Sequence, residues 1–257
     1  MKAVGRELEG KVALITGAGS GIGRAMAELF AERGCAIVAV DVVAERVDQV
    51  VSAITSHGGR AIGMVRNLSL QSDVERMVDD ALSSQGKIDI LCNNAGVMDN
   101  ASTVPETSDE LWERVMDINL NAPFRTCRKV IPIMLERGGG VILNTASVAG
   151  LFGGRAGAAY TVSKHGLIGL TKNIAATYGS KGIRCNAMAL GGVKTAIGIG
   201  GGTPSQLGME VLTKTMSVGA RMAEPIEIAR LALFLVSDDA SNVNGSIVTA
   251  DGGWTAP

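Results

Sequence analysis

The feature that most constrains the fold is a glycine-rich loop that joins an apolar run to a helical pattern near the start of the chain. Residues 12–15 (VALI) precede the loop TGAGSGIG at residues 16–23, and apolar residues then recur at helical spacing up to Gly34. A strand, a tight turn and a helix in this order bring the free N–H groups of the helix to a position that suits a diphosphate. The spacing is Gly-x-x-x-Gly-x-Gly and not the commoner Gly-x-Gly-x-x-Gly, so a turn without a ligand stays open at this point.

Strand-like and helix-like segments alternate along the rest of the chain. Helical patterns separate the strands and include a long one at residues 108–135, which contains Asn119 and which Pro123 is expected to kink. No linker or internal repeat interrupts the alternation, which indicates one parallel, doubly wound sheet. We therefore expect residues 1–257 to form a single α/β domain with helices on both faces of the sheet. The apolar runs that fit the later strands lie at residues 36–40, 61–65, 88–92, 141–143, 183–189 and 246–249.

Composition and charge exclude several classes of protein. Lys and Arg number 24 and Asp and Glu 25, which gives a net charge of −1 and no basic surface for nucleic acid or an anionic membrane. The apolar runs fall short of the ~20 residues of a membrane helix, and the first ten residues lack the order of a signal peptide. The four cysteines have no metal or redox spacing, and His57 and His165 have no neighbours at ligand spacing. We expect a cytoplasmic protein with reduced cysteines and no metal site.

An acidic residue ends the second predicted strand. Asp41 follows the apolar run at 36–40, where a carboxylate is placed to hold the two ribose hydroxyls of an adenosine. It would repel a 2′-phosphate, and neither Val42 nor Val43 beside it is basic, so the sequence favours NAD over NADP. The alternative is that Asp41 only caps the helix that starts near Ala44.

A serine, a tyrosine and a lysine share a spacing that suits proton transfer. Tyr160 and Lys164 are four residues apart in a helical pattern that begins near Gly157, so their side chains share one face. A lysine ammonium beside a phenol favours the phenolate and lowers the pKa of the phenol from its ordinary value of ~10. Ser147 ends an apolar strand and is placed to reach the same oxygen. The pattern predicts general acid–base chemistry, although Tyr-x-x-x-Lys alone also fits an ordinary helix with a solvated lysine.

Two further polar positions stand out. The fourth predicted strand ends in Asn93-Asn94-Ala95-Gly96, at the end of a strand where open α/β sheets bind ligands. Asn119 lies inside a helical pattern, where asparagine lowers helix propensity. It therefore indicates a specific hydrogen bond, with an ordinary polar residue as the equally weighted alternative.

Together these motifs resemble those of the classical short-chain dehydrogenase/reductase family, and the resemblance extends from about Gly10 to Trp254. It rests on the joint order of residues 16–23 (TGAGSGIG), 93–96 (NNAG), Asn119, Ser147, 160–164 (YTVSK) and 251–253 (DGG). The resemblance implies a Rossmann-type sheet of seven strands in the order 3-2-1-4-5-6-7. It also implies hydride transfer by a nicotinamide cofactor.

The resemblance assigns a role to each matching position. Tyr160 would be the acid/base on the substrate oxygen, Lys164 would lower its pKa and bind the nicotinamide ribose, and Ser147 would donate a hydrogen bond to that oxygen. Asn119 would hold a water in a proton relay behind Lys164. The positions expected to bind NAD are Gly17, Ser20, Gly21, Ile22, Gly23, Asp41, Asn67, Leu68, Asn94, Ala95, Gly96, Tyr160, Lys164, Val193 and Thr195.

The chain departs from the family pattern at two places. Asn67 stands where an aspartate usually contacts the adenine amine, and its oxygen is still able to accept that hydrogen bond. Leu190 stands where a proline usually precedes Gly191, which should loosen the start of the segment that follows. That segment, residues 191–215, is long and rich in glycine, and we expect it to be a mobile lid over the substrate.

The substrate is expected to be a small molecule, mostly apolar, bound by the lid and by Met98, Ala149, Leu151, Phe152 and Arg155. Arg155 would meet an acidic substrate group or lie in solvent, whereas Trp254 is expected in the core or at a subunit contact. Small residues on several faces of the Tyr160 helix need burial, and family members pair this helix between subunits, so a homotetramer is expected, or else a dimer.

Three functions compete at this stage. The leading one is an NAD(H)-dependent oxidoreductase for a secondary alcohol or its ketone. The second is a 3-oxoacyl-thioester reductase that prefers NADP. The third is a nucleotide-binding regulator without catalysis, which the complete set of Asn119, Ser147, Tyr160 and Lys164 disfavours.

Overall fold

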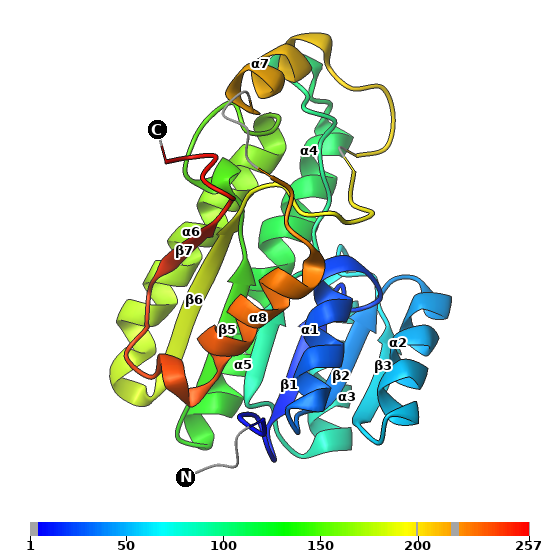
Figure 1. The fold of residues 1–257 in the computed structure, drawn as a ribbon, viewed down its shortest axis with the longest axis vertical. Helices are drawn as coiled ribbons and strands as arrows, with labels where there is room; N and C mark the ends of the chain where they lie inside the picture. Colours follow the sequence, from blue (N-terminus) through cyan, green and yellow to red (C-terminus); the bar gives the residue numbers. More distant parts are fainter. Residues whose placement is uncertain (1–4, 199, 217–220, 257) are drawn as a thin grey trace.

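The computed structural model of the protein describes residues 5–198, 200–216 and 221–256. Its strands form one parallel sheet in the order β3-β2-β1-β4-β5-β6-β7, which confirms the expected order (Figure 1). Adjacent strands are hydrogen-bonded in parallel register across the whole sheet. The strands are β1 (Val12–Thr16), β2 (Ala36–Asp41), β3 (Arg60–Val65), β4 (Ile90–Asn93), β5 (Gly140–Thr145), β6 (Ile183–Leu190) and β7 (Ile247–Ala250).

Helices cover both faces of this sheet. One face packs against α1 (Gly21–Glu32), α2 (Ala44–Ser56) and α8 (Pro225–Val236), and the other against α3 (Gln71–Gln85), α5 (Ala122–Glu136) and α6 (Ala158–Tyr178). All five residues of β1 are buried, because a parallel strand covered on both faces meets no solvent. Burial on both sides explains why these strands are continuous apolar runs without alternation.

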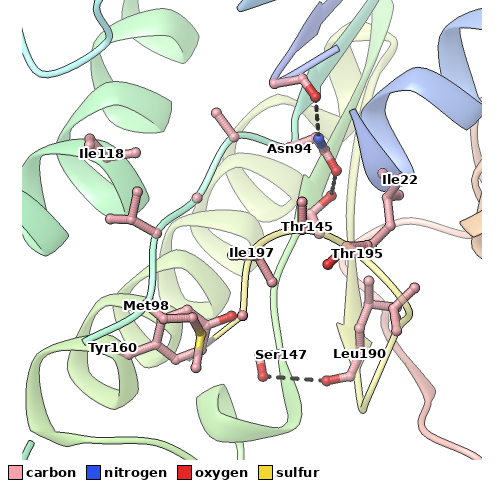
Figure 2. Close-up of a pocket in the computed structure, with 18 of the residues that line it drawn as sticks. Ile22, Asn94, Met98, Ile118, Thr145, Ser147, Tyr160, Leu190, Thr195 and Ile197 are labelled. Atoms are coloured by element: carbon pink, nitrogen blue, oxygen red, sulfur yellow. Dashed lines mark hydrogen bonds between the residues drawn. The ribbon is translucent and has the colours of Figure 1, made fainter. Parts of the chain in front are cut away.

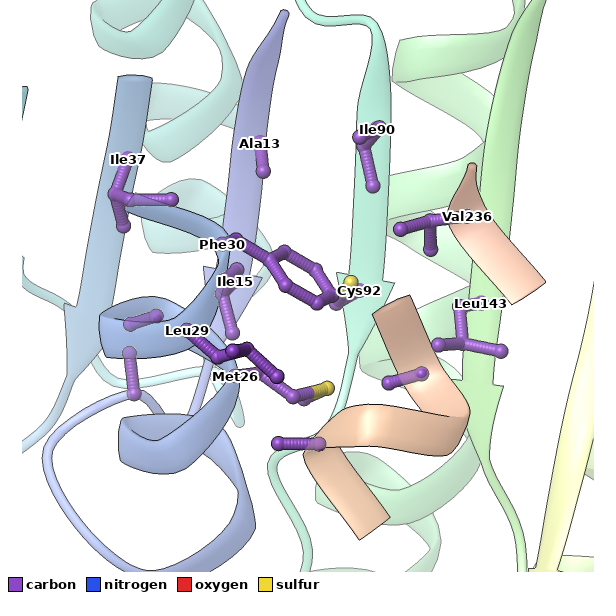
Figure 3. Packing of buried hydrophobic residues seen from close by; sticks show 14 of the residues in the cluster. Ala13, Ile15, Met26, Leu29, Phe30, Ile37, Ile90, Cys92, Leu143 and Val236 are labelled. Atoms are coloured by element: carbon purple, nitrogen blue, oxygen red, sulfur yellow. The ribbon is translucent and has the colours of Figure 1, made fainter. Parts of the chain in front are cut away.

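The core on the first face is centred on the contact of α1 with the sheet. Figure 3 shows Met26 and Phe30 of α1 packed against Ile15 and Cys92, with Val236 of α8 beside them. The two helices therefore cover neighbouring parts of the central sheet, α1 over β1 and α8 between β4 and β5. This packing fixes the N-terminus of α1 at the carboxyl end of β1, where the glycine loop lies.

The helix predicted at residues 108–135 is interrupted. It consists of α4 (Asp109–Met116), a π-helical turn η2 (Asp117–Asn121) and α5. Asn119 lies in the π-helical turn, where the wider coil exposes backbone groups that a regular helix would pair. Pro123 lies in the first turn of α5, directly after the π-helical turn and four residues after Asn119. The kink expected at Pro123 stays a prediction.

The segment after β6 is more ordered than its glycine content suggests. It contains α7 (Gln206–Met216), which the sequence did not predict and which lies at one end of the molecule, above the carboxyl ends of the strands (Figure 1). Val193 and Ala223 form an isolated parallel bridge that joins the two ends of this segment. Of the expected lid at 191–215, Ile199 lies outside the described residues.

Candidate active site

A cavity of about 610 Å³ lies at the carboxyl ends of the strands, below α7. Figure 2 shows that its wall combines Asn94 and Thr145 from two central strands with Thr195 and Ile197 from the segment after β6. Gly23 and Asn119 are not among the lining residues, although both were predicted site positions. The predicted positions that line it are Gly17, Ser20, Gly21, Ile22, Asp41, Asn67, Leu68, Asn94, Ala95, Gly96, Ser147, Tyr160, Lys164, Val193 and Thr195.

The glycine loop forms the start of α1 at the cavity wall. Gly17 and Gly21 have φ of 65° and 53°, a left-handed conformation that glycine adopts without strain. Ser20 is the N-cap, no side chain caps the helix, and its first turn holds no acidic residue. A Cβ on Gly21 would lie 2.9 Å from Cγ2 of Thr195, so only glycine leaves space between them. These residues fit a diphosphate, because uncapped N–H groups of a helix N-terminus face an open wall.

Gly23 has a packing role. A Cβ at this position would lie 2.0 Å from the carbonyl oxygen of Gly17. The residue is buried in α1 and allows the helix to lie directly against the loop. It therefore supports the loop from behind and does not face the cavity.

A hydrogen-bond network fixes the end of β4 to the end of β1. The side-chain nitrogen of Asn94 donates to the carbonyl oxygen of Thr16 at 3.1 Å, and its oxygen accepts from the Thr145 hydroxyl at 3.2 Å (Figure 2). The Thr16 hydroxyl accepts from the backbone amides of Asn94 and Ala95. This arrangement holds Asn94, Ala95 and Gly96 in place along the cavity wall.

Asp41 lies at the end of β2, where the sequence placed it, and its carboxylate is well connected. One oxygen accepts from the amide of Gly19 at 3.0 Å, and the other accepts from the amides of Val42 and Val43. The helix α2 that follows has Val43 as its N-cap and no side-chain capping bond. Asp41 therefore joins the glycine loop to the β2 turn and does not cap α2 in the usual way.

The sequence argument considered only Val42 and Val43 beside Asp41, so it missed basic residues that the fold brings to the same wall. Arg46 in the first turn of α2 and Arg66 after β3 both line the cavity with Asp41. Arg66 forms an ion pair with Asp80, and Arg46 approaches the glycine loop through its Cβ. The sequence would have allowed Arg46 to be found, because it lies in the first turn of the helix that follows the strand end.

Asn67 and Leu68 follow β3 and line the same end of the cavity. The side-chain oxygen of Asn67 accepts hydrogen bonds from the amide and the hydroxyl of Ser69, at 3.1 and 2.8 Å. These bonds orient the side-chain amide of Asn67, since its oxygen faces Ser69 and its nitrogen therefore points away from Ser69.

Tyr160, Lys164 and Ser147 meet at the cavity wall. Lys164 is 2% exposed, its Nζ donates to the carbonyl oxygen of Thr145 at 2.8 Å, and it lies 5.4 Å from the ring centre of Tyr160. Ser147 donates to the carbonyl oxygen of Leu190 at 3.3 Å and accepts from the amide of Ala149 (Figure 2). The structure thus brings together the three side chains that the sequence grouped.

Burial changes the proton affinities of this pair. It raises the pKa of Tyr160 to about 12, against a lowering contribution from a hydrogen bond with Ser147 and a further raising contribution from the charge of Asp99. Burial also lowers the pKa of Lys164 to about 8. The sequence predicted a lowered pKa for Tyr160, whereas in the structure this pKa is raised. Desolvation of the phenol outweighs the hydrogen bond with Ser147, which alone lowers the pKa.

Asn119 is fully buried behind Lys164. Its side-chain oxygen accepts from the amide of Val97 at 2.9 Å, and its nitrogen donates to the carbonyl oxygen of Val97 and to the Ser163 hydroxyl. The specific hydrogen bond predicted for this residue is confirmed. A Cβ on Gly96 would lie 3.4 Å from the Asn119 oxygen and 3.6 Å from Nζ of Lys164, so the three groups are close neighbours.

The remaining wall is mostly apolar. Of the expected pocket residues, Met98 and Arg155 line the cavity, whereas Ala149 is fully buried outside it and Leu151 and Phe152 face solvent. Trp254 is buried, as expected, and it also lines the cavity. Residues that sequence reasoning did not assign to the wall include Arg114, Ile118, Thr145, Met216 and Met222, whereas Ile197 and Leu212 belong to the expected lid.

Within the described ranges, no group of three or more His, Cys, Asp or Glu side chains is arranged to hold a metal ion. Among the described helices, none combines the length and apolar character that a membrane crossing requires.

Comparison with known proteins gives consistent matches over nearly the whole chain. A family model described as enoyl-(acyl carrier protein) reductase matches residues 17–255. The 3β-hydroxysteroid dehydrogenase 2 of Eggerthella lenta is 43% identical over 97% of this chain and 96% of its own length. The cyclohexanol dehydrogenase of an Acinetobacter species is 39% identical over 99% of both chains.

The fold also matches solved structures. One of them is a protein from Beutenbergia cavernae described as an NAD(P)-dependent gluconate 5-dehydrogenase and solved with bound NADP. It superposes with a TM-score of 0.86 and 35% identity over 97% of this chain and 98% of that one. The motifs, the strand order and these matches agree. The chain is therefore an oxidoreductase of the classical short-chain dehydrogenase/reductase family.

Proposed function

We propose that this protein interconverts a secondary alcohol and its ketone with NAD(H), using Tyr160 as the acid/base. The observation that carries the proposal is the convergence of Tyr160, Ser147 and Lys164 on a cavity that also contains the uncapped N-terminus of α1. A proton-transfer group and a diphosphate site in one cavity suit hydride transfer by a dinucleotide.

The nicotinamide cofactor would supply or accept the hydride. The phenol of Tyr160 would give its proton to the carbonyl oxygen in reduction and accept it back in oxidation. Because burial raises the pKa of Tyr160 to about 12, the phenol holds its proton at neutral pH and is ready to act as the acid. Ser147 would donate to the same oxygen, and the positive charge of Lys164 would stabilise the phenolate after transfer.

Lys164, Asn119 and the β4 turn act as one unit in this proposal. Asn119 holds the backbone of Val97 and the Ser163 hydroxyl, beside Gly96 and Lys164. The predicted water relay behind Lys164 stays a prediction, supported by the polar groups that meet there. The predicted cofactor residues of the glycine loop, of β4 and of the segment at Val193 and Thr195 stay proposals of the same kind.

The preference for NAD rests on Asp41. Its carboxylate lies on the cavity wall at the end of β2, where it would hold ribose hydroxyls and repel a phosphate. An NADP-preferring reductase is the second candidate, because Arg46 and Arg66 line the same wall and would attract a 2′-phosphate. Replacement of Asp41 by asparagine tests the two, since it should weaken NAD binding and improve NADPH binding only if the carboxylate makes the selection.

For the substrate, we propose a cyclic secondary alcohol. Two relatives are named for hydroxysteroid and cyclohexanol oxidation. The wall near Tyr160 includes Met98, Ile118 and Leu212, which suit an apolar ring. A single domain over residues 1–257, a mobile lid at 191–215, a homotetramer and a cytoplasmic location complete the proposal.

The test is the change in NADH and NADPH absorbance with cyclohexanol, cyclohexanone and 3-hydroxysteroids at neutral and alkaline pH. Tyr160→Phe should lower kcat about 10²–10⁴-fold and leave cofactor binding in place. Tyr178, the other of the two tyrosines, provides the matched control Tyr178→Phe, which should retain activity. Turnover that survives in Tyr160→Phe would contradict the assignment, and NAD binding without any turnover would favour the regulator.

A further inference from the structure

Arg155 occupies a defined position on the cavity wall, between the 3₁₀ turn η3 (Val148–Gly150) and α6. Its guanidinium lies 5.0 Å from the ring centre of Trp254 and 6.0 Å from that of Phe152. Stacking on two rings holds a guanidinium plane in one orientation. Arg155 is therefore a fixed, half-buried cation at the edge of the cavity.

This cation has no acidic partner among the described residues. The Nε atom of Arg155 is buried and lacks a hydrogen-bond partner. Asp41 is the one carboxylate in the described lining, and it lies beside the glycine loop, whereas Arg155 lies beside α7 and the C-terminal segment. A buried N–H donor of a cation is costly to leave without an acceptor, so this part of the wall is suited to an anion.

Three distant segments are joined around Arg155. The Thr215 hydroxyl of α7 donates to the carbonyl oxygen of Gly154 at 3.0 Å, and the Trp254 indole donates to the carbonyl oxygen of Thr215 at 2.6 Å. Leu212 and Met216, from the same helix, line the cavity next to this junction. The lid helix, the loop before α6 and the chain end thus form a common wall that carries the guanidinium.

We propose that Arg155 binds a carboxylate at the end of the substrate remote from the reacting alcohol, so that the preferred substrate is a cyclic hydroxy acid. The planar fork of a guanidinium matches a carboxylate through two parallel hydrogen bonds. The diphosphate of a cofactor would lie at the N-terminus of α1, away from the junction of α7 and Trp254. This inference rests on the proposed function, since it names the substrate class of that same cavity.

The kinetic test compares 4-hydroxycyclohexanecarboxylate with its methyl ester, which has the same ring and no charge. Wild-type protein should show at least a tenfold higher kcat/KM for the acid. Arg155→Met should remove this preference through a higher KM for the acid, and Arg155→Lys should keep part of it. Arg114 of α4 also lines the cavity and gives the matched control: Arg114→Met should keep the preference.

A binding test reports on the same contact without turnover. The chain has two tryptophans, and Trp112 does not line the cavity, so Trp112→Phe leaves Trp254 as the fluorescent probe. Cyclohexanecarboxylate should change Trp254 fluorescence in a saturable way, and cyclohexanecarboxamide should not. The signal should disappear when Arg155→Met is added to this background.

The outcomes separate this inference from the proposed function. Equal kcat/KM for the acid and the ester in wild-type protein overturns the role of Arg155 and leaves the dehydrogenase assignment intact. A preference that survives in Arg155→Met, or that Arg114→Met removes, also overturns it. If neither compound nor cyclohexanol is oxidised but the carboxylate still changes Trp254 fluorescence through Arg155, then the proposed turnover of cyclic alcohols fails and the carboxylate site stands.

Discussion

The carboxylate of Asp99 accepts a hydrogen bond from the backbone amide of Tyr160 at 2.8 Å, and its second oxygen accepts from the amide of Gly157 at 3.1 Å. Asp99 is fully buried, and burial raises its pKa. The N-cap of α6 is Gly157, which has no side chain to cap the helix. Asp99 therefore caps α6 from another loop and fixes the turn from which Tyr160 projects.

We expect Asp99→Ala to lower both stability and kcat. Two buried amides would lose their acceptor, at roughly 1–3 kcal/mol each, so urea denaturation should show a loss of about 2–5 kcal/mol. Asp99→Asn keeps one acceptor oxygen and should lose less. Asp48→Ala on exposed α2 is the control and should stay near wild type. A stability of Asp99→Ala equal to that of the control would show that the cap is unimportant.

The buried state of Lys164 should appear as a pH dependence of stability. Its pKa is about 8 in the folded protein and ~10.5 when unfolded, so the unfolded chain binds more protons between these values. Stability from this group therefore rises with pH across about 8–10, by on the order of 3 kcal/mol in all. Lys164→Met should lack this rise, as measured by urea denaturation at each pH.

The comparison of wild type with Lys164→Met is necessary because other groups make stability fall as the pH rises. Burial raises the pKa of Cys35 and of Cys127 to about 12, which makes stability fall with rising pH above their unfolded values. This effect is the same in wild type and Lys164→Met, and it cancels in the difference. A difference that stays constant from pH 7 to 10 would contradict the assignment.

The packing of α1 on its loop predicts a severe effect of a single methyl group. In Gly23→Ala, the new Cβ would overlap the carbonyl oxygen of Gly17, so α1 must move from the loop. Stability should fall by about 3 kcal/mol and NAD binding should weaken, as followed by thermal unfolding and titration. Gly153 has open space around it, and Gly153→Ala should remain within about 0.5 kcal/mol of wild type. Equal behaviour of the two variants would refute the packing argument.

The proposed homotetramer should have a mass near four times the chain mass of 26.4 kDa in light scattering. Phe124 of α5 is 46% exposed, and Val162 of α6 is similarly open, as expected for apolar residues at a contact. Phe124→Lys should yield smaller species. Val65 on edge strand β3 is 45% exposed, and Val65→Lys should leave the mass unchanged, since lysine is well tolerated at sheet edges. A monomeric wild type would end this proposal.

Much of the fold was predictable because local and global signals agree. Each strand is an apolar run between turn residues, and α8 begins at Pro225, where its Glu224–Glu227 capping box fixes the start. The wall residues at the strand ends followed from the same pattern. Tyr160 and Lys164 were found because helical spacing alone brings them together.

The other features of the fold and of the site depend on contacts between distant residues, which no local sequence pattern indicates. Asn119 in the π-helical turn is held by hydrogen bonds to Val97 and Ser163 in other segments. The helix α7 lies in a glycine-rich stretch of low helix propensity. Trp254 and Arg155 are far apart in sequence and meet only when the C-terminal segment folds over α7. The direction of the Tyr160 pKa shift likewise required the burial that tertiary packing sets.

The bridge between Val193 and Ala223 has an evolutionary consequence. The amide of Lys194 donates to the carbonyl oxygen of Ala223, and the amide of Ala223 donates to that of Gly192, each at 2.9 Å. The segment between Val193 and Ala223 therefore leaves the scaffold and returns to it at one hydrogen-bonded neck. Insertions or exchanges between the two ends of this neck act on the cavity wall and leave the hydrogen bonds of the sheet in place. One catalytic framework is thereby able to acquire new substrates through a replaceable module.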